Sequence, residues 1–205
     1  ANTLIGMYAK CGSLTEAHDV FDDMQIHDVV SWSALASGYA EHGHGQNTFK
    51  CLKLMQNEGL PPDAVTFICI LKACGSVKAI EKGRQIHDEI LTRSLLEKDI
   101  VLGTALVDMY AKCGALEKAQ KVLEELPIRD IVSWNAIISG YAEQGQFHEA
   151  LKCYERMQTE GLSPNEVTFI CIIKACVSIR AIDKGKEIHE QIVNRGFLKK
   201  DIVLS

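Results

Sequence analysis

The most constraining feature of this sequence is an internal repeat with a period of 102 residues. Asp-Val-Val-Ser-Trp begins at Asp28, and the matching Asp-Ile-Val-Ser-Trp begins at Asp130. After a shift by one period, residues 64–99 and 166–201 agree at 21 of 36 positions. A long period of this kind indicates an array of stacked units, because each unit is too small to bury a core alone.

The eight cysteines follow the same repeat. Cys11 corresponds to Cys113, and the other six also form pairs that lie one period apart. The repeat explains the cysteines better than a disulfide framework does. No Cys-x-x-Cys motif occurs, so no zinc site is predicted. The sequence also lacks a nucleophile–base pair and a glycine-rich phosphate loop. We therefore predict no catalytic residue, no metal and no cofactor.

Composition and charge narrow the class of partner. No apolar run reaches the length of a membrane helix, so no membrane association is predicted. The formal net charge of −5 argues against a partner that is held by phosphate neutralisation alone. A nucleic-acid partner would have to be bound largely through its bases. The N-terminal Ala-Asn-Thr-Leu has no targeting character, so we expect any targeting peptide to lie upstream.

Recurring signals divide one period into three helical hairpins of 35, 36 and 31 residues. Each unit opens with an apolar or β-branched pair and is expected to contain a glycine-bearing turn between its two helices. The hydroxyl residues expected at the helix N-caps are Ser31, Thr66, Ser133 and Thr168. The predicted units are 1–28, 29–63, 64–99, 100–130, 131–165 and 166–201, and residues 202–205 open another.

Unit 131–165 shows the hairpin pattern most clearly. Apolar side chains recur at helical spacing from Trp134 to Tyr141, and again from Ala150 to Met157. Gly145 and its glutamine neighbours interrupt the two stripes. At this spacing the tryptophan is more often a core residue than a stacking platform for bases. We predict an all-α fold, namely a right-handed α-solenoid of stacked helix–turn–helix hairpins.

These motifs resemble the pentatricopeptide repeat proteins of the plant PLS subclass. The resemblance is carried by Tyr-Ala-Lys-Cys-Gly at Tyr110, by the Asp-Ile-Val-Ser-Trp stretch at Asp130, and by Leu-Lys-Ala-Cys and Ile-His in unit 64–99. It covers the whole chain, whose units correspond to S, P, L, S, P and L repeats, the first of them truncated at its N-terminus. The resemblance implies sequence-specific binding of single-stranded RNA, with one base for each repeat.

In that family the fifth and last residues of a repeat read the base, and the second residue packs against it. By position, the reading pairs are Asn2 with Asp28, Ser33 with Asp63, Ile68 with Asp99, Thr104 with Asp130, Asn135 with Asn165, and Ile170 with Asp201. The base-clamping residues are Val30, Val65, Val101, Val132, Val167 and Val203.

The chemistry of these pairs agrees with the family's rules. An ionised aspartate only accepts, which suits the ring N–H of uracil or guanine, whereas asparagine also donates and can meet cytosine. The small hydroxyl groups of Ser33 and Thr104 leave room for a purine. Ile68 and Ile170 cannot hydrogen-bond a base edge, so the long repeats should discriminate poorly. The predicted RNA is 5′-U-G-n-G-(C/U)-n-3′.

The resemblance also implies a setting. The chain would be the specificity array of an RNA-processing or C-to-U RNA-editing factor in a mitochondrion or chloroplast, without enzymatic activity of its own. Small organellar editing-factor proteins are expected partners, and the ends inside repeats suggest end-to-end self-association. The alternative is a protein-interaction solenoid of the tetratricopeptide kind, which shares the hairpin plan but repeats every ~34 residues.

Overall fold

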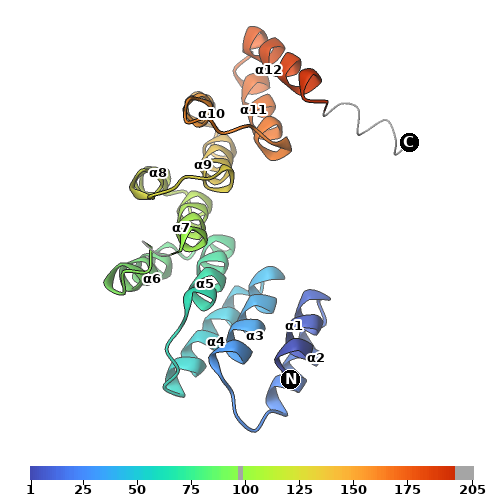
Figure 1. Cartoon of the computed structure of the whole chain (residues 1–205), viewed down its shortest axis with the longest axis vertical. Helices are drawn as coiled ribbons and strands as arrows, with labels where there is room; N and C mark the ends of the chain where they lie inside the picture. Colours follow the sequence, from blue (N-terminus) through green and yellow to red (C-terminus); the bar gives the residue numbers. More distant parts are fainter. Residues whose placement is uncertain (97–98, 197–205) are drawn as a thin grey trace, which may run out of the picture. The chain divides into compact units, whose positions relative to one another are not determined.

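The computed structural model describes residues 1–96 and 99–196. This part of the chain contains twelve α-helices and no strand (Figure 1). The helices are α1 (Asn2–Lys10), α2 (Leu14–Asp22), α3 (Val29–Glu41), α4 (Gly45–Asn57), α5 (Ala64–Val77), α6 (Ile80–Thr92), α7 (Ile100–Lys112), α8 (Leu116–Glu125), α9 (Ile131–Glu143), α10 (Phe147–Thr159), α11 (Glu166–Ser178) and α12 (Ile182–Asn194). Within the described ranges, none of them is both long enough and apolar enough to cross a membrane.

The helices group into two compact units, Ala1–Pro127 and Ile128–Ser205. In the first unit the odd-numbered helices α1, α3, α5 and α7 contact one another in sequence, and each packs against the even-numbered helix that follows it. In the second unit α9 contacts α11, while α10 and α12 pack against them. The predicted all-α solenoid of stacked hairpins is therefore confirmed.

The turns inside the hairpins follow the glycine prediction only in part. Gly43 and Gly145 have φ values of 77° and 73°, a left-handed conformation that other residues rarely adopt. They lie between α3 and α4 and between α9 and α10. In the two long units the prediction is wrong, because Lys78 and Arg180 hold this conformation with φ of 54° and 56°.

The helices begin earlier than the hydroxyl residues suggested. The N-cap of α3 is Asp28, whose Oδ1 accepts from the backbone N–H of Ser31 at 2.7 Å. Ser31 Oγ in return accepts from the backbone N–H of Asp28 at 2.9 Å. The predicted N-cap is thus the third helical residue of a capping box. In the other three helices the N-caps are Asp63, Asp130 and Asn165, not Thr66, Ser133 and Thr168, and the capping box is complete at Asp130 and Asn165.

Both tryptophans lie in the core, as their spacing predicted. Trp32 is 4% exposed and Trp134 is 1% exposed. The indole N–H of Trp32 donates to Glu58 Oε2 at 2.8 Å, and that of Trp134 donates to Glu160 Oε2 at 3.2 Å. Each tryptophan therefore holds the first helix of its hairpin against the end of the second.

Burial separates the cysteines into thiols of very different reactivity. The eight cysteines all lie within the described ranges and are free thiols. Burial raises the pKa of the Cys51 thiol to about 12 and that of Cys74 to about 12, whereas Cys11 is exposed. Only the thiolate reacts with an alkylating reagent.

We expect iodoacetamide at pH 8 to label Cys11 rapidly in the native protein and to label Cys51 and Cys74 only after unfolding. Peptide mapping by mass spectrometry at increasing times measures the order. A Cys11→Ser variant is the control, since it should remove the fast phase alone. Labelling of Cys51 as fast as that of Cys11 would contradict the burial.

Candidate nucleic-acid interface

The valines predicted to clamp bases occupy one repeated position and are exposed. Each is the second residue of an odd-numbered helix, and their exposed fractions lie between 50% and 62%. Each of these helices therefore exposes one apolar side chain at its second position. These residues are Val30, Val65, Val101, Val132 and Val167. Val203 lies outside the described residues.

Two of the predicted reading pairs join by hydrogen bonds between their own side chains. Ser33 Oγ donates to Asp63 Oδ1 at 3.3 Å in the first unit. Asn135 Nδ2 donates to Asn165 Oδ1 at 3.0 Å in the second. Residues that are 30 positions apart in the sequence are thus brought together, because the N-cap of one odd-numbered helix lies beside the first turn of the preceding one.

The Asn2–Asp28 pair is joined in the same way. Asn2 Nδ2 lies 3.3 Å from Asp28 Oδ1 and 3.4 Å from Oδ2. The backbone N–H of Ser31 donates to the Asp28 carboxylate and lowers the pKa of that carboxyl. Asp28 is therefore an anionic acceptor at neutral pH.

The fourth predicted pair divides between the two units. Thr104 is buried on α7 of the first unit, and its hydroxyl is one of two buried side-chain polar atoms without a partner in the described ranges. Asp130 caps α9 of the second unit through the backbone N–H of Ser133, at 2.8 Å.

In the two long repeats the residue at the fifth position is isoleucine, whose side chain has no hydrogen-bonding group. Ile68 is half-buried on α5, and Ile170 is 49% exposed on α11. Asp99 caps α7, accepting from the backbone N–H groups of Val101 and Leu102. Asp201 lies outside the described residues.

Sequence analysis did not identify the threonine hydroxyl groups that hydrogen-bond to two of the reading pairs. Thr66 Oγ1 lies 2.8 Å from Ser33 Oγ and donates to Asp63 Oδ1 at 2.7 Å. Thr168 Oγ1 donates to Asn135 Oδ1 at 2.7 Å. Both threonines are the third residue of their helix, a position that the sequence reading assigned only to capping.

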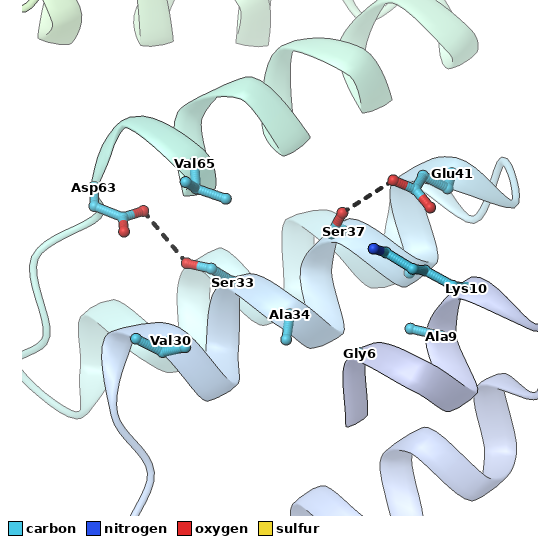
Figure 2. A pocket seen from close by; sticks show the side chains of 11 residues that line it. Gly6, Ala9, Lys10, Val30, Ser33, Ala34, Ser37, Glu41, Asp63 and Val65 are labelled. Carbon is cyan, nitrogen blue, oxygen red and sulfur yellow. Dashed lines mark hydrogen bonds between the residues drawn. The ribbon is translucent and has the colours of Figure 1, made fainter. Parts of the chain in front are cut away.

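In the first unit, one reading pair lines a pocket of about 320 Å³, together with other residues of α1, α3 and α5. Ser33 and Asp63 contribute its polar atoms at one end, and Val30 and Val65 are the clamping valines beside them (Figure 2). Lys10 reaches in from α1. A polar pair and two exposed valines from successive odd-numbered helices therefore surround a single cavity.

The rest of this pocket is lined by Lys10, Glu41 and uncharged residues of α1 and α3. A Cβ atom added at Gly38 would lie 2.6 Å from Ala9 Cβ, so glycine lets α3 approach α1 closely. Ser37 Oγ donates to Glu41 Oε1 at 3.3 Å near Lys10 (Figure 2). In the described ranges no three histidine, cysteine or acidic side chains gather into a metal site. The pocket offers hydrogen bonding and apolar contact rather than a strongly charged surface.

Comparison with known families decides which group of proteins this is. A model of the PPR repeat family matches residues 27–76 and 129–178, and a model of the single PPR repeat matches residues 1–29 and 104–131. Together these matches cover well over half of the chain. The chain belongs to the pentatricopeptide repeat family.

Pentatricopeptide repeat-containing proteins of Arabidopsis thaliana are among its curated relatives. One is 37% identical over 96% of this chain and 27% of its own length. A chloroplastic relative is 37% identical over 97% of this chain and 32% of its own length, and a mitochondrial one is 36% identical over 96% and 19%. The chain thus spans less than a third of the length of these pentatricopeptide repeat proteins.

Solved pentatricopeptide repeat structures share the fold. The protein PPR10 in complex with an 18-nucleotide psaJ RNA element matches with a TM-score of 0.78 and 20% identity, over 91% of this chain and 29% of PPR10. The nuclear proteinaceous RNase P 2 of Arabidopsis thaliana matches with a TM-score of 0.60 and 14% identity, over 78% and 37%. At these identities the likeness concerns the helical-hairpin fold alone.

Proposed function

We propose that this pentatricopeptide repeat chain binds single-stranded RNA, one base for each repeat, without catalysis of its own. The observation that carries the proposal is the recurrence of one arrangement. A hydrogen-bonded polar pair lies at the first turn of an odd-numbered helix, and exposed valines lie at the same turn of that helix and the next. The structural neighbour PPR10, crystallised with an RNA element, supports the same partner.

The pocket lined by α1, α3 and α5 offers the kinds of contact that a nucleobase needs. A base has two apolar faces and a polar edge, so its recognition needs apolar contact on the faces and hydrogen bonds at the edge. Val30 and Val65 supply the apolar contact, and Ser33 with Asp63 supplies the hydrogen-bonding groups. The odd-numbered helices α7, α9 and α11 also expose a valine at the same position, within their own units.

The proposed RNA is 5′-U-G-n-G-(C/U)-n-3′, read by the S, P, L, S, P and L repeats in order. Asp28, Asp63 and Asp130 supply acceptors for uracil or guanine at the first, second and fourth positions. The isoleucines of the L repeats leave the third and sixth positions unread. Because the net charge is −5, few phosphates are neutralised and affinity should depend only weakly on salt.

Within a cell, we place this array in an organellar RNA-processing or C-to-U RNA-editing factor. Its relatives include chloroplastic and mitochondrial pentatricopeptide repeat proteins, which supports an organelle as the compartment. Small organellar editing-factor proteins are the protein partners that we propose, since an acidic array gains affinity from a partner that adds phosphate contacts. End-to-end association of arrays is the second protein contact that we propose.

The proposal predicts a position-dependent response to single-base changes. We expect G→A at the second base of the RNA to weaken binding about tenfold, because adenine lacks the N1–H group with which guanine donates to Asp63. Fluorescence anisotropy with labelled six-base RNAs measures the affinities. The same substitution at the third base, opposite Ile68, is the control and should change affinity little. Equal affinity for all these RNAs, or no binding to any of them, would contradict the proposal.

A further inference from the structure

The direction of each hydrogen bond at the Asn135–Asn165 pair follows from the helix cap. The backbone N–H of Thr168 can only donate, so the atom 3.1 Å from it must be an acceptor. That requirement turns Asn165 Oδ1 towards the start of α11. The amide nitrogen Nδ2 is then on the other side, and it donates to no protein atom in the described ranges. Because Asn165 Nδ2 is also not one of the buried polar atoms that lack a partner, this nitrogen is accessible to solvent.

The cap also fixes the amide of Asn135. The backbone N–H of Asn165 donates to Thr168 Oγ1 at 3.1 Å, so the hydroxyl proton is directed to the amide oxygens, the nearer being Asn135 Oδ1 at 2.7 Å. Asn135 Nδ2 donates one of its two N–H groups to Asn165 Oδ1. Asn165 Oδ1 therefore accepts two hydrogen bonds, and Asn135 Oδ1, on a side chain that is only 8% exposed, accepts one, so the pair offers a ligand chiefly its remaining N–H donors.

The Ser33–Asp63 pair differs, because it offers a ligand hydrogen-bond acceptors instead of donors. Thr66 Oγ1 donates its proton to Asp63 Oδ1 at 2.7 Å, so the Ser33 hydroxyl is the other donor, with Thr66 Oγ1 at 2.8 Å and Asp63 Oδ1 at 3.3 Å as its two acceptors. The Ser33 proton is thereby used inside the protein. The groups that remain are the Ser33 lone pairs and Asp63 Oδ2, and both are acceptors.

The Asn2–Asp28 pair shows what happens when serine replaces threonine at this third position. Ser31 Oγ donates to the backbone oxygen of Asp28 at 2.8 Å instead of reaching the reading pair. Asn2 Oδ1 is left buried, and no residue that the structure describes donates to it. The capping box at Asp28 is nevertheless complete. The threonine hydroxyl is thus what occupies the amide oxygen of the fifth residue, and it does so independently of capping.

Two adjacent donors match only one pyrimidine. Cytosine presents N3 and O2, which are adjacent acceptors, whereas uracil presents an N3–H donor between two carbonyl groups. A uracil in this site would place its N3–H against an amide N–H. We propose that Thr168 is a positioning residue that orients Asn135 and Asn165 as donors and thereby restricts this site to cytosine. The proposal rests on the RNA-binding function and narrows its fifth base from C or U to C.

The test compares RNAs that carry C or U at the fifth position and are otherwise identical. The wild-type chain should prefer cytosine by about tenfold, since uracil leaves a donor facing a donor. Thr168→Ser should reduce that preference to about threefold or less, because a serine hydroxyl can turn to the backbone oxygen, as Ser31 does. Thr168→Val, which has no hydroxyl, should reduce it likewise. Both variants should keep the preference for guanine at the second base, and Thr66→Ser is the matched control that leaves the C/U ratio unchanged.

The outcomes separate this inference from the proposed function. Equal wild-type affinity for C and U, with the guanine preference intact, overturns the cytosine assignment while RNA binding stands. An unchanged C/U ratio in both Thr168 variants overturns the positioning role. Failure of every RNA to bind overturns the proposed function itself. Circular dichroism of Thr168→Ser checks that the variant is folded, as expected because serine completes the capping boxes at Asp28 and Asp130.

Discussion

Trp134→Ala should lower the free energy of unfolding of the second unit by about 3–5 kcal/mol, the range observed for large-to-small changes at fully buried aromatic residues. The side chain is 1% exposed and packs beneath the guanidinium of Arg156, whose Cζ lies 5.6 Å from the ring centroid. Its removal leaves a cavity between α9 and α10 and takes away the N–H partner of Glu160. Urea denaturation followed by circular dichroism measures the loss.

Trp134→Phe is the matched control. It keeps most of the buried ring and loses the indole N–H bond, while Glu160 Oε2 still accepts from Arg129 Nε at 2.9 Å. We expect a smaller loss of about 1–2 kcal/mol. The phenylalanine variant should also retain the base preferences of the wild type. A selective loss of RNA affinity in a stable phenylalanine variant would instead identify Trp134 as a stacking platform for bases.

The fold could be predicted because the evidence for it repeats. The apolar stripes of the hairpins recur after 102 residues, so each period predicts the same helices. Trp134 is buried in the core, as its position in the apolar stripe predicts. The helix starts were missed for a physical reason. Aspartate and serine are almost equally good N-caps, so composition cannot say which of Asp28 and Ser31 lies outside the helix. Only the backbone path shows that aspartate is the N-cap and that serine, at the third helical position, completes the capping box.

The sequence was enough to predict which residues of the candidate site lie together, but not which hydrogen-bond donors and acceptors they offer to a ligand. The reading pairs were placed by counting along the repeats, and the structure brings Ser33 to Asp63 and Asn135 to Asn165. Which atoms remain for a ligand depends on Thr168, a residue 33 positions from Asn135. A sequence shows that an asparagine can both donate and accept. It does not show that a distant hydroxyl has already used the acceptor.

Asp63→Asn should shift the preference of its site from guanine towards adenine while changing stability little. Asparagine caps helices as well as aspartate does, so the bond to the backbone N–H of Thr66, 2.8 Å long in the wild type, should persist. The cap would hold the amide oxygen inward and leave an N–H where Oδ2 was. That N–H repels the N1–H of guanine and can donate to N1 of adenine. We expect the G/A affinity ratio to fall by about 30-fold, or about 2 kcal/mol.

Asp63→Ala separates the two roles of this side chain. Alanine neither caps α5 nor meets a base edge, so the free energy of unfolding should fall by about 1 kcal/mol and guanine affinity should fall without any gain for adenine. Anisotropy with G and A at the second base, together with urea denaturation, measures both effects. If the asparagine variant still prefers guanine, the carboxylate does not read that base. If the alanine variant is as stable as the wild type, the cap contributes nothing, and the argument that capping sets the polarity of the site fails with it.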